Sequence, residues 1–120
     1  MPEYLARLSA TKAHYPFQKW IRSGLPQYSE ESCGKFVQIF DLLIEELAEL
    51  GPDASEEKKL ECFHHAVLEL NALNDKDGDL IETGEREDLS ELCNLITVAA
   101  GLDPNDYGDG EGPASEWREW

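Results

Sequence analysis

The stretch SEESCGKFVQIFDLLIEELAEL, residues 29–50, decides the fold of this chain. Apolar residues recur in it at steps of three and four, and this spacing places them on one face of an α-helix. They are Cys33, Phe36, Phe40, Leu43, Leu47 and Leu50, and the face is widened by Val37, Ile39 and Ile44. Ser29 is a suitable N-cap, and the glutamates that follow it suit the positive end of the helix dipole. We therefore predict a central helix that begins after Ser29 and ends near Leu50.

Two further helices follow, because the same spacing returns twice. The stretch 55–74 carries an apolar stripe, and so does a stretch that begins near 83–85 and ends near residue 100. The stripes are Leu60, Phe63, Val67 and Leu70 in the first, and Leu89, Leu92, Cys93, Ile96, Ala99 and Ala100 in the second. GPDAS at 51–55 breaks the chain after the central helix, Thr83 can cap the last helix, and Gly101 can end it. No stretch alternates with period two for long enough to form a strand.

The two ends of the chain differ from this core. Residues 1–29 hold two short helical stretches, four basic residues, one acidic residue and a cluster of aromatic side chains. Such rings need cover, so we expect this arm to pack over the acidic helical core, residues 30–101. The alternative is that its basic residues leave a surface of two signs for a partner. Residues 102–120 are too rich in glycine, aspartate and proline for regular structure, except for a last turn with Trp117 and Trp120. We predict that all 120 residues form one all-α domain, a small helical bundle of three longer helices with an N-terminal arm of short helices and an irregular C-terminal segment.

The charge of the chain is strongly negative. It has 26 acidic and 10 basic residues, for a net charge of −16 at pH 7 with neutral histidines. This charge argues against a nucleic-acid partner, whose phosphates need a basic surface, and against an anionic membrane. A basic protein partner or a metal cation is favoured instead. The alternative is that the charge serves only solubility.

Three further features bear on where the protein works. The chain has no apolar run of about 18 residues, which predicts that it has no membrane span. The N-terminus, MPEYLARLSATK, lacks the apolar segment of a signal peptide. The odd number of cysteines (Cys33, Cys62 and Cys93), with one in each predicted long helix, is not a disulfide framework. We therefore expect a cytoplasmic protein whose three cysteines are small core residues.

The acidic stretch LNDKDGDLIETGERED, residues 73–88, raises the question of a calcium site. A calcium loop needs oxygen ligands at its first, third and fifth positions, glycine at the sixth and glutamate at the twelfth. Counted from Asp75, the aspartates fit, but leucine occupies the sixth position and Arg86 the twelfth. A second acidic loop, 103–116, is a slightly better fit, because a count from Asn105 places glycine sixth and glutamate twelfth, but tyrosine and proline occupy ligand positions. We therefore predict polar turns, with Arg86 as a structural tie to Glu82 or to the preceding helix.

Part of this region resembles a known family. The pattern is Asn-x-Leu on one helix, then Ile-Glu-Thr-x-x-Arg-Glu at the start of the next. Here it is formed by Asn71 and Leu73, then Ile81, Glu82, Thr83, Arg86 and Glu87. In this pattern the chain resembles a family of small, acidic, helical bacterial proteins of uncharacterised activity, a domain of unknown function. The resemblance covers residues 66–120 and is most specific within 71–87. It implies a helical fold and a bacterial source, and it brings no activity with it.

One helix face could hold a metal ion. Glu61, His65 and Glu69 follow one another at steps of four, which places them on one side of a helix, with Cys62 nearby. The alternative is a row of solvated glutamate–histidine pairs. No motif for a serine nucleophile, a nucleotide phosphate or a dinucleotide is present, so an enzyme is disfavoured and no cofactor is predicted. A metal-binding protein or small hydrolase that uses this face is the alternative function.

The function that the sequence favours is non-enzymatic binding. An acidic surface would sequester a basic protein, as bacterial immunity proteins and antitoxins do, by electrostatic steering followed by an aromatic anchor. The candidate contact residues are Asp75, Asp77, Asp79, Glu82, Arg86, Asp106, Asp109, Glu111 and Trp117. The two tryptophans of the tail could instead cover the open end of the bundle beside Trp20. A homodimer with paired helix faces is a third alternative.

Overall fold

Helices make up the architecture of the chain. The computed structural model describes residues 2–23, 28–76, 81–118 and 120, and these ranges contain no strand. None of the helices in them has the length and hydrophobicity of a membrane span. The long helices are α3 (Glu30–Leu50), α4 (Glu56–Lys76) and α5 (Thr83–Ala99). Before them come α1 (Pro2–Ala10), the 3-10 helix η1 (Thr11–His14) and α2 (Phe17–Arg22). After them come the 3-10 turns η2 (Pro104–Asp106), η3 (Gly108–Gly110) and η4 (Pro113–Glu116). The predicted all-α bundle is confirmed.

Local chemistry sets both ends of α3. Ser29 Oγ accepts a hydrogen bond from the Ser32 N–H at 3.2 Å, and Ser32 Oγ accepts one from the Ser29 N–H at 2.9 Å. This reciprocal pair satisfies backbone donors that no helical carbonyl can reach. Gly51 follows the helix with a φ of 81°, a left-handed value that a residue with a side chain rarely adopts. The helix therefore begins and ends where the sequence predicts.

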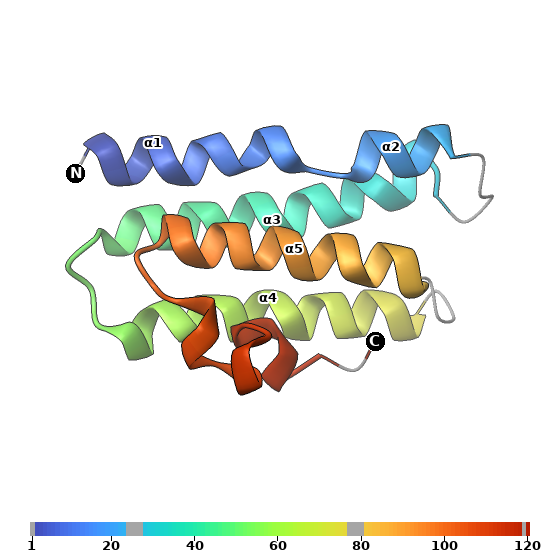
Figure 1. Cartoon of the computed structure of the whole chain (residues 1–120). Helices are drawn as coiled ribbons and strands as arrows, with labels where there is room; N and C mark the ends of the chain where they lie inside the picture. The colour runs from blue at the N-terminus through green and yellow to red at the C-terminus, as the bar shows by residue number, and fades with distance from the viewer. Residues whose placement is uncertain (1, 24–27, 77–80, 119) are drawn as a thin grey trace.

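α3 lies at the centre of the hydrophobic core. Its stripe is fully buried from Cys33 to Leu47. α4 runs along α3 in the opposite direction, while α1 and α2 lie end to end along another side of the bundle (Figure 1). The stripes of α4 and α5 supply the facing core residues, which include Phe63, Val67, Leu70, Leu89, Leu92 and Ile96. The periodicity of the sequence thus identified both the central helix and its buried face.

One helix end and one N-cap differ from the prediction. α4 is two residues longer at its end, and α5 has Glu82 as its N-cap, so that Thr83 lies inside the helix. The Arg86 N–H donates to Glu82 O at 2.8 Å, which closes the first helical turn one residue early. α4 extends because Asn74 stays helical while its Oδ1 accepts a hydrogen bond from the Ile81 N–H at 2.7 Å. Ile81 is buried, so this bond anchors the α4–α5 connection to the core.

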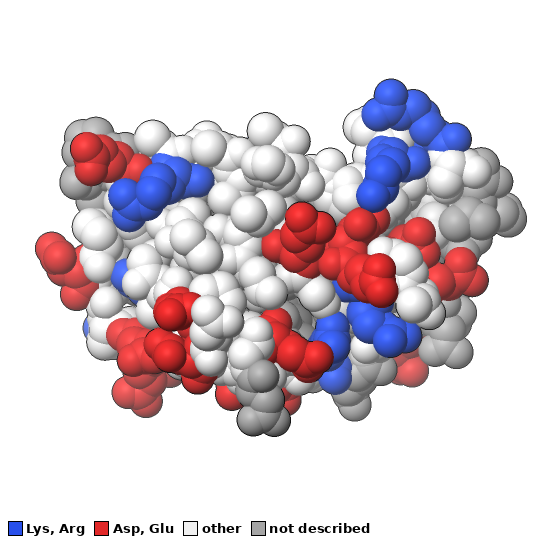
Figure 2. Space-filling view, in the orientation of Figure 1, with Lys and Arg blue, Asp and Glu red and all other residues white. Residues whose placement is uncertain are grey.

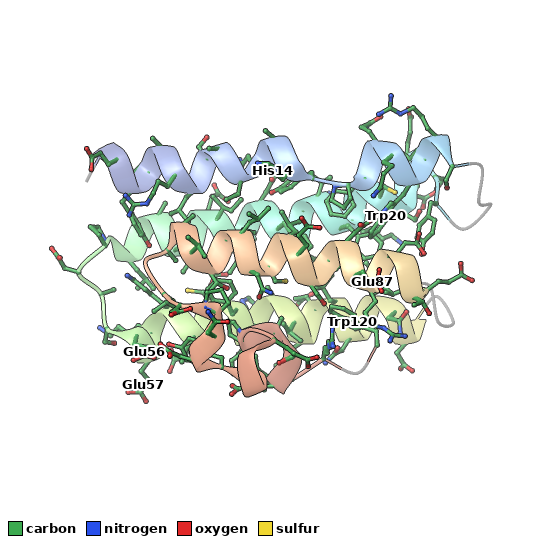
Figure 3. All side chains as sticks on the ribbon, viewed as in Figure 1. His14, Trp20, Glu56, Glu57, Glu87 and Trp120 are labelled. Atoms are coloured by element: carbon green, nitrogen blue, oxygen red, sulfur yellow. The ribbon has the colours of Figure 1, made fainter. Side chains whose placement is uncertain are left out.

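The N-terminal arm packs its aromatic side chains on α3. Phe17 stacks on Phe36 with ring centroids 5.6 Å apart, and Trp20 meets Phe36 edge-on at 5.3 Å. Trp20 reaches from α2 toward α5 (Figure 3), where its Nε1–H donates to Asp88 Oδ2 at 2.9 Å. Lys19 Nζ lies 2.9 Å from the same carboxylate oxygen. The basic arm therefore covers the acidic core of its own chain, as expected.

The C-terminal tail, residues 102–120, has more local structure than its composition suggests. Its 3-10 turns pack on α4 and α5. Tyr107 donates a hydrogen bond to Glu56 at the start of α4, and Asn94 of α5 donates one to Glu111 O at 3.2 Å. Gly112 has a φ of 102°, and a Cβ there would lie 1.9 Å from Asn94 Oδ1. Contacts with the helices and glycine conformations therefore set the path of the tail.

A buried cation joins two chain segments at one end of the bundle. Lys59 of α4 is 5% exposed. Its Nζ donates to Pro52 O at 2.9 Å and to Ala100 O at 2.8 Å, and it lies 5.4 Å from the centre of the Tyr4 ring. These bonds satisfy carbonyls in the turn after α3 and at the end of α5, which have no helical donor. No periodic pattern in the sequence marked this lysine.

Candidate functional site

A groove runs between α3 and α4. Its volume is about 440 Å³, and in the part of the chain that the structure describes only residues of these two helices line it. Its apolar lining, which we call the floor, consists of Ile39, Leu42, Leu43, Cys62, Ala66, Ala72 and Leu73. Its polar lining, which we call the rim, consists of Lys35, Gln38, Glu46, His65 and Glu69. We call this feature the α3–α4 groove.

The floor of the groove exposes apolar surface on the central helix. Leu42 is 44% exposed, whereas its neighbour Leu43 is 1% exposed. Ile39 is partly buried and lies on the same side of α3 as Leu42, because residues three apart share a helix face. α3 is therefore apolar over a wider arc than the core covers. Ile39 carried this signal in the sequence, but Leu42 was missed because it lies outside the core stripe.

A histidine between two carboxylates forms part of the rim. His65 Nδ1 lies 3.1 Å from Glu46 Oε1, and His65 Nε2 lies 3.8 Å from Glu69 Oε1. The structure thus joins two members of the predicted trio, but the nearer partner is Glu46 of α3 and not Glu61. Among the described residues, no group of three or more histidine, cysteine, aspartate or glutamate side chains is arranged to hold a metal ion. Only the packing of α3 on α4 brings Glu46 to His65.

The thiol of Cys62 lies on the groove floor and is buried. Burial raises its pKa, and the negative charges of Glu46 and Glu61 raise it further, to about 11. Cys33 and Cys93 are also free and buried, and burial raises the pKa of Cys93 to about 12. The three thiols are therefore protonated at neutral pH, and a protonated thiol is a poor nucleophile. The prediction that the cysteines are core residues is confirmed.

The predicted contact residues fall into two groups that the structure does not bring together. One group lies at the connection between α4 and α5, and its described members are Asp75, Glu82 and Arg86. The other lies on the tail, which begins at the far end of α5 (Figure 1), and its described acids are Asp106 and Glu111. Trp117, also on the tail, packs on α4 beside Asn71. Asp77, Asp79 and the side chain of Asp109 lie outside the described residues. All four described acids of the two groups are exposed and open to a partner.

Two of these residues have a structural setting. Arg86 is half-buried, its backbone N–H bonds to Glu82 O, and its Nε has no hydrogen-bond partner among the described residues. Glu82 and Glu85 lie beside the buried ring of Tyr28. Burial raises the pKa of Tyr28, and the negative charge of Glu85 raises it further. The start of α5 is therefore tied to the residue that leads into α3.

Trp117 holds the tail against α4. Its ring stacks on His64 with centroids 4.6 Å apart and an angle of 23° between the planes. Asn71 Nδ2 donates to Trp117 O at 3.0 Å. Trp117 is half-buried, which fits the alternative in which it covers the bundle. Asn71 belongs to the Asn-x-Leu pattern, so part of that pattern serves to fix the tail.

Negative charge covers much of the visible surface. Figure 2 shows acidic side chains at lower left, around the start of α4 and the tail, and right of centre, over α5. The exposed side chains of Glu56 and Glu57 lie at the outer edge of the molecule at the start of α4 (Figure 3). Basic side chains in this view lie mainly on the arm and near the C-terminus. A cationic partner would meet acidic surface over several elements.

No protein-family model, curated protein or solved structure matches the chain in the comparisons with known proteins. The resemblance to a bacterial family therefore stays a prediction.

Proposed function

We propose that this protein is a non-enzymatic acidic binding protein that sequesters a basic protein partner. The observation that carries the proposal is the excess of acid. With 26 acidic and 10 basic residues, at least sixteen carboxylates have no basic side chain of their own to pair with. Such a surface attracts a cationic protein from a distance and orients it before contact. Bacterial immunity proteins and antitoxins offer the model for this mode of action.

The placement of the acids supports a role beyond folding. Glu49 lies in the last turn of α3, Glu45 and Glu46 come just before it, and no basic residue lies in that turn. A negative charge at the C-terminal end of a helix opposes the helix dipole and destabilises it by about 0.3–1 kcal/mol. Solubility alone could be served by acids at the other end of the helix, where they stabilise it. Acidic residues at an unfavourable position favour a partner that uses them.

The metal-binding alternative has less support. It needs Glu61, His65 and Glu69 to converge, and the nearer partner of His65 is a glutamate of another helix. A hydrolase that used Cys62 would need a thiolate, and burial opposes its formation. Non-enzymatic binding requires neither group and uses the acids that the chain has in excess.

A capture experiment tests the proposal. The purified protein is immobilised and exposed, at low salt, to a lysate of the organism that encodes it, and bound proteins are eluted by rising salt and identified by mass spectrometry. An unrelated immobilised protein of similar size and net charge is the control. We expect one dominant basic protein that is absent from the control and is released as salt screens the charges. A partner with an acidic or neutral surface would contradict the proposal.

A further inference from the structure

The bundle covers two of its sides with its own chain ends and leaves a third side open. α1 packs on α3 and α5, and η1 packs on α5. On the opposite side, η4 packs on α4 and α5 (Figure 1). The remaining side is the α3–α4 groove, where no described residue outside these two helices contributes to the lining. An apolar floor without cover is the usual sign of a binding surface.

The shape of the groove suits a helix. Its lining on α3 extends from Lys35 to Glu46, which is about 16 Å, or three turns, at the rise of an α-helix. The facing wall extends from Cys62 to Leu73 over the same number of residues. A helix bound in such a groove presents apolar residues at steps of three and four, so that three turns supply a full set of anchors. Leu42 at the floor offers them exposed apolar surface.

The charge around the groove indicates which kind of partner helix can bind there. Glu46 and Glu69 stand on its two walls, with His65 between them. Together α3 and α4 carry eleven acidic and four basic residues. A second copy of this chain would bring another net charge of −16 against this surface, which disfavours self-association. A helix with basic residues beside its apolar face has the complementary charge.

From these observations we infer that the α3–α4 groove binds a cationic amphipathic helix of the partner. The apolar face of that helix lies on Leu42 and Ile39, and its lysines or arginines face Glu46 and Glu69. Lys35 lines the groove at the other end of its α3 wall, so the basic residues concentrate toward the Glu46 end. The inference rests on the proposed function, because it names the segment of a basic partner that the protein holds and the surface that holds it.

A designed peptide tests the groove. The probe has about 18 residues, long enough to form a helix, with leucines along one face and lysines along the other. A scrambled peptide of the same composition has equal charge and no apolar face. Affinities are measured by isothermal titration calorimetry at low and moderate salt. We expect the amphipathic peptide to bind at least about tenfold more tightly than the scrambled one, since only the former can bury a row of leucines.

Matched variants locate the binding site. Leu42→Gln is expected to weaken binding about tenfold, whereas Leu68→Gln, on an equally exposed leucine of α4 outside the groove, is expected to have little effect. The double variant Glu46→Gln and Glu69→Gln should weaken binding more than Glu31→Gln with Glu57→Gln, which removes the same charge from the same helices away from the groove. Circular dichroism confirms that each variant folds. Shifts in the amide NMR spectrum of the unmodified protein should map to α3 and α4.

The outcomes separate this inference from the proposed function. If both peptides bind equally and Leu42→Gln has no effect, the groove is not the site, and salt-sensitive binding of both peptides would still support recognition by charge. If neither peptide binds, the inference is wrong, and the capture experiment decides the general function by itself. If the free protein is a dimer that Leu42→Gln converts to a monomer, a second copy occupies the groove and the inference is overturned.

Discussion

Asp88 shows how one side chain can hold an element in place. Partial burial raises the pKa of its carboxyl group, but the hydrogen bonds from Lys19 and Trp20 outweigh this effect and leave the pKa below its usual value. A carboxyl group whose pKa is lowered by folding stabilises the fold above its unfolded pKa of about 3.9, and this contribution is lost as the pH falls through the folded pKa. The attachment of the arm should therefore weaken in acid.

The variant Asp88→Asn tests this coupling. It keeps the shape of the side chain but removes the charge, so we expect a loss of about 1 kcal/mol in the free energy of unfolding at pH 7. The difference between variant and unmodified protein should begin to shrink as the pH falls below about 3.9 and should vanish only below the lowered pKa of folded Asp88. Urea denaturation over a series of pH values from 7 downward measures this difference. Glu87→Gln, on the exposed neighbour labelled in Figure 3, is the control and should show no such dependence.

Lys59 gives a second prediction at this scale. Lys59→Met keeps most of the apolar stem but removes both hydrogen bonds, leaving Pro52 O and Ala100 O without their donor. We expect a loss of about 2 kcal/mol in the free energy of unfolding, since each bond is to a charged group. Urea denaturation measures it, and Lys58→Met on the exposed neighbour is the control. A loss no larger than that of the control would show that Lys59 contributes little.

The sequence predicts these two contacts only in part. The aromatic residues of the arm predicted that Trp20 needs cover, because a large ring is rarely left in water. The choice of Asp88 as its partner was not predictable, since the two residues are 68 positions apart and meet only when α2 lies on α5. The role of Lys59 was not predictable either, because its partners are backbone carbonyls and no residue type marks their position in the sequence.

At the scale of elements, glycine has a different role in the tail from the one it has in the long helices. Gly112 needs a left-handed φ and has no room for a Cβ, whereas Gly34 lies in α3, where a Cβ would have no neighbouring atom within 4 Å. We expect Gly112→Ala to lower the free energy of unfolding by more than about 1 kcal/mol through strain and the clash with Asn94. Gly34→Ala should raise it by about 1 kcal/mol, since alanine favours a helix interior.

Thermal and urea denaturation measure the free energy of unfolding of both glycine variants. Because they make the same chemical change with opposite expected signs, each serves as the control for the other. Equal effects of the two substitutions would mean that the tail does not depend on the conformation of Gly112.

The elements differ in how far the sequence predicts them. The three long helices follow from periodicity and caps, because most of the information that sets a long amphipathic helix lies within it. The tail does not follow, since its turns depend on Tyr107 and Asn94 bonding to partners on other elements. The helix α5 begins within the predicted range, but its N-cap is Glu82 and not Thr83, because both residues can precede a helix and only tertiary packing selects between them.

At the scale of the molecule, the residues that line the α3–α4 groove are also only partly predictable from the sequence. The sequence predicted a face with His65 and Glu69, which belong to one helix. It could not predict Glu46, because the register of α3 on α4 is a property of the packed bundle. Composition alone predicts the acidic character of the whole molecule. It does not predict that acidic residues line an apolar groove between α3 and α4.

The net charge of the whole molecule leads to a prediction on salt. Sixteen uncompensated negative charges repel one another in the compact state more than in the extended chain. Raising NaCl from about 0.01 to 0.5 M shortens the screening length from about 30 Å to a few ångström. The melting temperature should therefore rise, by about 4 °C for each kcal/mol gained in a domain of this size.

Differential scanning calorimetry measures this effect. The double variant Glu31→Gln and Glu57→Gln has less charge to screen, so its melting temperature should rise less with salt. A melting temperature that falls as NaCl is added would show that attractive charge pairs, and not repulsion, dominate the surface.

The arm-to-core contact of Trp20 and Asp88 also has a consequence for synthesis. The arm leaves the ribosome before α5, and Asp88 follows Trp20 by 68 residues. At translation rates of about 5–20 residues per second, Asp88 is synthesised about 3–14 s after Trp20, and the ring lacks this partner during this time. During that interval the nascent chain exposes an aromatic, basic segment. Glu30 and Glu31 at the start of α3 are the first cluster of acidic side chains to emerge after it. Repulsion between like charges opposes the association of nascent chains until α5 is synthesised.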